Sequence, residues 1–413
     1  MYFAHENGRV IGAPDKLFGV SQLAKERIAQ KGKENVINTT LGVLLNEEGN
    51  LVVLESVMDA IKDLSPEDYA AYAPILGLPE YLEAVKEAVF LGDVPAGIAV
   101  EACYTPGVTG AIRNAVSAYT VPGDQVLTSN WHWAPYNAIA KELGRSVQTY
   151  ELFDADWKFN AEAFDAGLAQ VLAGQEQTLV IINTPAHNPT GYTFTLEDWD
   201  RVQASCAKHP EKKIVILADI AYLDFAGDAK AYRQFLPKLA AMPENVLSLL
   251  AFSASKGFTM YGMRCGALIC MAPSAEIAKE FKDTMQVECR ASWSNGNRAA
   301  MQVIADIFAD SALKKKVFDE RDHYLAILKE RGQVFTQEAE KAGLVICPYD
   351  SGFFVTVPCG DADTAERVGR ALQDMDVFAV VLGSGVRITI AANTMDECRR
   401  LPAMVQKAVE QSR

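Results

Sequence analysis

One lysine of this chain lies where its amine can do chemistry. Lys256 comes directly after an apolar run, residues 246–252, and is flanked by the hydroxyls of Ser253 and Ser255, with Arg264 shortly after it. An apolar run of this length is typical of a strand buried on both faces. A lysine at its exit can form a Schiff base with an aldehyde. Hydroxyls beside a guanidinium are good partners for a phosphate.

A ligand that combines an aldehyde with a phosphate is pyridoxal 5′-phosphate (PLP). Taken alone, Lys256 also has a simpler interpretation, a solvated lysine at a strand end with Arg264 on the surface. Whether Lys256 is a Schiff-base lysine or a solvated one depends on which other residues the fold places beside it.

A carboxylate is expected beside Lys256. The apolar run 214–218 ends in Asp219, and Tyr222 follows. Similar strands are predicted at 124–130, 147–152, 178–183 and 266–271, and helical patterns separate most of them. Such alternation predicts an α/β fold: an open, mostly parallel sheet with helices on both faces. The carboxyl ends of parallel strands share one edge, where ligands bind, so Asp219 and Lys256 are expected there together.

A glycine-bearing segment offers a place for an anion. Gly107, Val108 and Thr109 open a predicted helix that continues through Tyr119. Free backbone N–H groups at a helix start, together with a threonine hydroxyl, form a natural phosphate cradle. Many helices begin in this way, so the motif is weak by itself.

Two other segments each admit two interpretations. Trp131 and Trp133 follow a predicted strand and are either buried core or a platform on which a ring stacks. Residues 72–80, rich in proline and glycine, are either an ordinary turn or part of a site.

The chain of 413 residues is too long for one compact core. We expect an N-terminal arm with part of a small domain at 1–50, a large ligand-binding domain at 51–300, and a smaller α+β domain at 301–413. A helical pattern from 295 to 342, broken near Asp310 and Gly332, is expected to bridge the two domains. The small domain is expected to contain strands at 344–347, 352–357 and 386–390, and helices at 365–375 and 395–411.

Composition excludes several functional classes. The net charge of −14 argues against nucleic-acid and anionic-membrane binding, and we expect no membrane span. The start of the chain has no signal-peptide pattern. The eight cysteines form no C-x-x-C pair and the five histidines are dispersed, which predicts no metal site and a cytoplasmic protein with reduced thiols.

Several of these motifs agree in order and spacing with one family. From about Thr40 to the C-terminus the chain resembles the fold-type I, PLP-dependent class I aminotransferases, and it is most similar to their aspartate/aromatic amino-acid branch. The resemblance implies PLP as cofactor, an amino acid and a 2-oxo acid as substrates, and a homodimer with shared active sites.

The resemblance also gives roles to residues around the cofactor ring. Lys256 matches the Schiff-base lysine, and Asp219 matches the carboxylate that pairs with the pyridine nitrogen. Tyr222 and Asn188 match the hydrogen-bonding partners of the phenolic oxygen. Trp133 aligns with the aromatic residue that stacks on the ring.

The remaining matched positions contact the phosphate or the substrate. They are Gly107, Val108, Thr109, Ser253, Ser255 and Arg264 for the phosphate; Tyr72 and Ser294 for the phosphate of the neighbouring subunit; and Gly42, Asn188, Arg387 and Arg290 for the substrate. Arg387 would hold the α-carboxylate.

The chain departs from the family pattern at a few positions. Tyr136 stands where aspartate-specific members often carry a histidine that supports the pyridine-binding carboxylate. Val108 replaces a small polar residue, although only its N–H is needed. The stacking residue is Trp133 or, two positions earlier, Trp131. Arg290 either reads a second substrate carboxylate or is a surface arginine.

The implied function is a ping-pong aminotransferase acting on aspartate and glutamate or on aromatic amino acids, with Lys256 as Schiff-base and proton-transfer residue. The alternatives are another PLP reaction on the same fold, such as a C–S β-lyase, and a non-catalytic sensor that has kept the fold.

Overall fold

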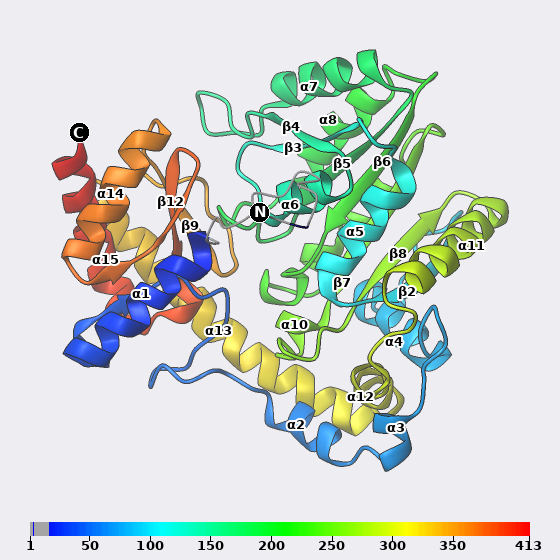
Figure 1. The fold of residues 1–413 in the computed structure, drawn as a ribbon, viewed down its shortest axis with the longest axis horizontal. Helices are drawn as coiled ribbons and strands as arrows, with labels where there is room; N and C mark the ends of the chain where they lie inside the picture. Colours follow the sequence, from blue (N-terminus) through cyan, green and yellow to red (C-terminus); the bar gives the residue numbers. More distant parts are fainter. Residues whose placement is uncertain (1–2, 4–15) are drawn as a thin grey trace.

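A seven-stranded sheet forms the core of the larger region, on the right of Figure 1. The computed structural model describes residue 3 and residues 16–413. The strand order is β2-β8-β7-β6-β5-β3-β4. The strands are β2 (Ala99–Thr105), β3 (Gln125–Ser129), β4 (Ser146–Tyr150), β5 (Gln177–Asn183), β6 (Lys213–Asp219), β7 (Val246–Ser253) and β8 (Gly266–Ala272). β8 alone runs opposite to the other six strands of this sheet, which confirms the predicted mostly parallel α/β fold.

The strands are apolar at successive positions because the sheet is covered on both faces. Leu179 of β5 packs in one hydrophobic cluster with α5 and α11, whereas its neighbour Val180 packs in another cluster with α7 and α8. Side chains alternate between the faces of a strand, so burial on both sides removes the polar alternation. The helices of this part are α5 (Gly107–Tyr119), α6 (Pro135–Glu142), α7 (Ala161–Gly174), α8 (Leu196–Cys206), α9 (Leu236–Ala240), α10 (Ala254–Gly257) and α11 (Ala275–Ser292).

A second hydrophobic cluster lies to the left in Figure 1, where residues from 37–52 pack with the C-terminal strands and helices. Strand β1 (Ile37–Asn38) pairs in parallel with β10 (Val377–Phe378), and β9 (Phe354–Pro358), β12 (Gly385–Thr389) and β11 (Val380–Leu382) form an antiparallel sheet. The helices here are α1 (Lys16–Lys31), α14 (Ala362–Asp374) and α15 (Met395–Ser412). The domain boundaries expected at residues 50 and 300 stay predictions.

Helices also join the two regions. Helix α13 (Ser311–Ala342) extends from the left-hand cluster to the lower right of Figure 1, beside α12 (Arg298–Ala309). The predicted break at Asp310 is confirmed, because its carboxylate accepts hydrogen bonds from Ala312 and Leu313 and caps α13. Before the sheet come α2 (Glu55–Lys62), α3 (Pro66–Ala70) and α4 (Pro79–Phe90). Within the described residues, no helix is long and apolar enough to cross a membrane.

Two local predictions were wrong. Helix α13 does not break at Gly332; a Cβ at this position would lie 2.5 Å from the Tyr349 hydroxyl, so the glycine makes room for a packed side chain. Residues 344–347 form no strand, because Leu344 donates its backbone N–H to Ala339 O and closes the end of α13 after Gly343, which is left-handed.

The contact at Gly332 predicts that Gly332→Ala destabilises the protein by about 1–3 kcal/mol, because the new methyl group overpacks a filled site. Gly174→Ala is the matched control: it is also a helical glycine, but no atom lies within 4 Å of its Cβ direction. We expect this control to be neutral or stabilising by up to about 1 kcal/mol. Chemical denaturation measures both.

Removing the Tyr349 hydroxyl tests the cause. In a Tyr349→Phe background, Gly332→Ala should cost less than in the parent, because the nearest clashing atom is gone. Equal costs in both backgrounds would contradict this account of the glycine.

Candidate active site

A cleft of about 710 Å³ opens at the carboxyl ends of β5, β6 and β7. This is the edge at which a parallel sheet binds ligands. Most of the predicted site residues line it. The lining residues are Gly42, Val108, Thr109, Trp133, Asn183, Asn188, Asp219, Ala221, Tyr222, Ser253, Ser255, Lys256, Arg264, Phe354 and Arg387.

Lys256 lies in the one-turn helix α10, directly after β7. Its ammonium donates a hydrogen bond to Gly42 O at 3.1 Å and lies 4.8 Å from the centre of the Tyr261 ring. Burial, followed by the positive charges of Arg264 and Arg387, lowers the pKa of Lys256 to about 8. A lowered pKa makes the neutral, nucleophilic amine more available near neutral pH.

Asp219, at the end of β6, is almost completely buried. The Tyr136 hydroxyl donates to its Oδ2 at 2.6 Å, and Ala221 N donates to Oδ1 at 3.2 Å. Burial raises the pKa of Asp219 to about 6, while the hydrogen bond from Tyr136 and the charge of Lys256 oppose that rise. The carboxylate therefore needs a cationic partner in the cleft to remain ionised at lower pH.

Tyr136 links this carboxylate to the aromatic wall of the cleft. Its ring meets Trp133 edge-on at 5.6 Å between centroids, and its hydroxyl holds Asp219. Tyr136, which stands where some family members carry a histidine, therefore supports Asp219 through a short hydrogen bond. Trp133 lines the cleft, whereas Trp131 packs against the backbone at Gly385, outside it.

Backbone and cationic groups also form a cradle where the start of α5 meets Ser255 and Arg264. Gly107 begins α5 at φ 69°, and a Cβ there would lie 2.5 Å from Arg264 Nη2. The guanidinium donates through Nη1 to Ser255 Oγ at 3.2 Å. No side chain caps the N-terminus of α5, so its free N–H groups and Arg264 together suit a phosphate.

Arg387 is buried in β12 with part of its hydrogen-bonding capacity unused. Its Nη1 donates to Asn188 Oδ1 and its Nη2 to Thr40 O, both at 3.2 Å, while Nε has no partner. No carboxylate of residues 16–413 lies within 4.0 Å of it, and burial lowers its pKa to about 10. Arginine binds carboxylates in bidentate fashion, so this group is ready for an acidic ligand.

Three predicted residues lie outside the cleft. Tyr72 is 87% exposed, and Arg290, near the end of α11, donates to Ser294 Oγ at 2.8 Å on the surface. The resemblance assigns Tyr72 and Ser294 to the site of a neighbouring subunit, and it leaves Arg290 as either a substrate-binding residue or a surface arginine.

Other cleft residues were missed in the sequence. Asn183 accepts a hydrogen bond from Asn188 N at 2.6 Å and donates to Asp219 O at 2.8 Å, so it orders the floor of the cleft. Its signal was its place as the polar residue at the exit of β5, as Asp219 is at the exit of β6. Tyr261 and Phe354 carried no such signal. Within the described part of the chain, no cluster of His, Cys, Asp and Glu is placed to hold a metal ion.

The fold and the cleft define an enzyme that holds a phosphorylated aldehyde cofactor and a carboxylate-bearing substrate. Residues 34–404 match the family Aminotransferase class I and II, and the chain belongs to this family. It is an aminotransferase of fold type I.

The similarity to relatives of known structure or sequence covers nearly the whole chain. A crystal structure of an aminotransferase from Anaerococcus prevotii superposes with a TM-score of 0.94 at 32% identity, covering 98% of this chain and 99% of that one. Aspartate aminotransferase from Salmonella typhi is 28% identical over 94% of this chain and 96% of its own length. Aromatic-amino-acid aminotransferase from Escherichia coli is 27% identical over 87% and 90%.

Enzymes of this family depend on PLP, which is the cofactor of this chain. A structure of an aromatic-amino-acid aminotransferase from Burkholderia pseudomallei, with the same fold, is described as covalently bound to PLP. The groups of the cleft fit this molecule: an amine for its aldehyde, a buried carboxylate for its ring nitrogen, and a cradle for its phosphate.

The Tyr136–Asp219 bond predicts that Tyr136→Phe weakens PLP binding roughly tenfold, as expected for losing a hydrogen bond to a charged group. Tyr136 lowers the pKa of Asp219, so the variant carboxyl stays protonated to higher pH. The decline of PLP affinity on acidification should therefore begin at higher pH. Absorbance titrations with PLP across pH measure both effects.

Tyr192→Phe is the matched control, since its hydroxyl donates to the buried Asp198 at the same 2.6 Å, outside the cleft. It should leave PLP binding unchanged. Identical PLP affinity and pH dependence in Tyr136→Phe and the parent would show that Tyr136 does not support Asp219.

Proposed function

We propose that this enzyme transfers an amino group from an amino acid to a 2-oxo acid by a ping-pong mechanism, with aspartate, glutamate or aromatic amino acids as donors. The observation that carries the proposal is the buried guanidinium of Arg387, which has no ion-pair partner among residues 16–413 and lies in the same cleft as Lys256. A site built to bind one α-carboxylate serves both the donor and the acceptor, as an exchange between two substrates requires.

The residues of the cleft divide the work. When bound, PLP supplies an aldehyde carbon that takes up the amino group and a ring that withdraws electrons from the substrate Cα. Lys256, with its pKa lowered to about 8, would hold the cofactor through its amine and would then serve as the group that takes up and returns the proton of the substrate Cα. Asp219 would keep the ring nitrogen protonated. Tyr222 and Asn188 would donate hydrogen bonds to the phenolic oxygen, and Arg387 would orient the α-carboxylate.

The proposal includes a homodimer. Tyr72, Arg290 and Ser294 lie outside the cleft of their own chain, and Tyr72 is largely exposed. They would complete the partner's site, with Tyr72 and Ser294 on the phosphate and Arg290 on a second substrate carboxylate. The relatives named above act, by their names, on aspartate and on aromatic amino acids, which supports both donor classes here. The division into 1–50, 51–300 and 301–413 and a cytoplasmic location belong to the same proposal.

The first test adds single amino acids to the PLP-loaded enzyme without any 2-oxo acid. We expect the absorbance of the aldehyde form of the cofactor to convert to that of pyridoxamine phosphate, fastest with the preferred donor. Lys256→Ala should not convert at a comparable rate. Release of pyruvate and ammonia from a sulfur amino acid would instead favour the C–S β-lyase, and binding without any conversion would favour a sensor.

A second test removes the carboxylate-binding group. Arg387→Leu should raise KM for both the amino acid and the 2-oxo acid by roughly 10- to 100-fold, as expected for a lost charge-assisted contact. The positive charge of Arg387 also lowers the pKa of Lys256, so the variant lysine should have a higher pKa and react more slowly with PLP at pH 7.5.

Arg400→Leu is the control, because Arg400 pairs with Asp396 on the exposed face of α15. It should change neither KM nor the reaction with PLP. Unchanged KM values in Arg387→Leu would remove Arg387 from the site.

A further inference from the structure

A segment near the N-terminus of the described chain crosses the active site. Thr40 O accepts from Arg387 at 3.2 Å, and Gly42 O accepts from Lys256 at 3.1 Å. Leu44 N donates to the hydroxyl of Tyr261 at 3.1 Å. Two main-chain carbonyls of this segment therefore touch the two cationic groups on which the proposed reaction depends.

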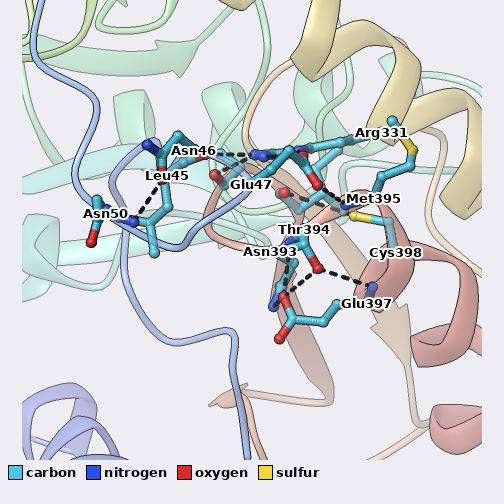
Figure 2. Close-up of polar contacts among 12 residues, drawn as sticks. Leu45, Asn46, Glu47, Asn50, Arg331, Asn393, Thr394, Met395, Glu397 and Cys398 are labelled. Carbon is cyan, nitrogen blue, oxygen red and sulfur yellow. Dashed lines mark hydrogen bonds and ion pairs between the residues drawn. The ribbon is translucent and has the colours of Figure 1, made fainter. Parts of the chain in front are cut away.

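Beyond the cleft the same segment turns back on itself. Leu45 bridges Leu51 in antiparallel fashion, and Asn46 accepts hydrogen bonds from Gly49 N and Asn50 N, which closes a tight turn (Figure 2). The returning strand then bonds through Leu54 N to Thr259 at 3.0 Å. We call residues 40–54 the crossing segment.

One buried arginine holds the crossing segment from the far side. Arg331, in the middle of α13, is fully buried, and its Nη1 donates to Leu45 O at 2.9 Å and to Ala391 O at 3.1 Å. Its Nη2 and Nε donate to the same oxygen of Glu47, at 2.6 and 3.1 Å (Figure 2). Within residues 16–413, Glu47 is the ion-pair partner of Arg331.

The carboxylate of Glu47 also holds the start of α15. Its second oxygen accepts from Met395 N at 2.9 Å, beside the capping box that Thr394 and Glu397 form (Figure 2). A carboxylate at a helix N-terminus is favoured by the helix dipole and by the free N–H groups there. Glu47 therefore connects the crossing segment to two helices, α13 and α15, through charge-assisted bonds.

The two halves of this contact differ in their access to water. The Arg331 side chain is 0% exposed, whereas that of Glu47 is 47% exposed. The arginine is buried and also bonded to the carbonyls of Leu45 and Ala391, whereas water can compete for the half-exposed carboxylate. Of the two residues, Arg331 is therefore the one held in place, and Glu47 is the one that water can release.

We propose that the Glu47–Arg331 pair is a clamp that positions the crossing segment, and through it the carbonyls of Thr40 and Gly42, against Arg387 and Lys256. Glu47 and Arg331 are positioning residues, since neither lines the cleft. The consequence for the reaction, though not the clamp itself, rests on the proposed function. Opening of the clamp would loosen the wall beside the substrate without disturbing the phosphate cradle.

The test compares the PLP-loaded parent with Glu47→Ala and Glu47→Gln. Amide hydrogen exchange in peptides covering 40–54 should accelerate in Glu47→Ala by roughly tenfold or more, and less in Glu47→Gln, which keeps the shape and a neutral acceptor. KM for the amino acid should rise roughly tenfold in Glu47→Ala, with kcat changed less than KM and PLP affinity unchanged.

Two further variants separate positioning from general destabilisation. Glu338→Gln removes an ion pair with Lys341 on the same helix α13 and should behave as the parent. Arg331→Lys keeps the charge but cannot reach two carbonyls and a carboxylate together, so we expect it to resemble Glu47→Ala in exchange and in KM.

The outcomes distinguish the clamp from the reaction. Parent-like exchange in residues 40–54 of Glu47→Ala would overturn the clamp, whatever the activity. Faster exchange across the whole chain, with equal losses in kcat and PLP affinity, would also overturn it in favour of a general structural role. Faster local exchange in an enzyme that shows no transamination would leave the clamp standing and remove the proposed function.

Discussion

The cleft contains more positive than negative charge. Lys256, Arg264 and Arg387 face a single carboxylate, Asp219, among the residues that line it. Burial makes such charges costly unless a ligand completes them, and the lowered pKa values of Lys256 and Arg387 and the raised pKa of Asp219 express that cost. An anionic cofactor and an anionic substrate are the groups that balance this set.

Much of the surrounding structure follows from that requirement. The approach of α5 to Arg264 needs a residue without a Cβ at Gly107, and the buried Asp219 needs the donor that Tyr136 supplies. Each of these is a local condition for keeping charge in a space with little water. The second hydrophobic cluster brings Arg387 to the edge of a sheet that belongs to the first. The site is thus a contact between two cores as well as a strand edge.

The sequence was sufficient for those parts of the fold and site that depend on local pattern. The predicted strands included all five that form the parallel part of the sheet, and Asp219 and Lys256 were found because each follows an apolar run. The helix break at Gly332 was wrongly predicted because the reason for that glycine, Tyr349, comes from a different element. Tyr261 and the Glu47–Arg331 pair were missed because their partners, Leu44 for Tyr261 and each other for the pair, are distant in sequence. Asn183 was missed although it stands at the exit of β5, as Asp219 does at the exit of β6. The sequence also could not decide between Trp131 and Trp133. Only the packing shows that Trp133 lines the cleft and that Trp131 lies against Gly385.

The pairing of β1 with β10, and of Glu47 with the start of α15, affects the order in which parts of the protein can fold during synthesis. Ile37 pairs with Val377 in the register of β1 and β10, and Glu47 accepts a hydrogen bond from Met395 N, so some partners of residues 37–47 come much later in the chain. During synthesis, the sheet and Lys256 are made well before those partners leave the ribosome. The residues of the proposed phosphate cradle are therefore synthesised before Val377 and Met395, which complete the contacts of β1 and of Glu47.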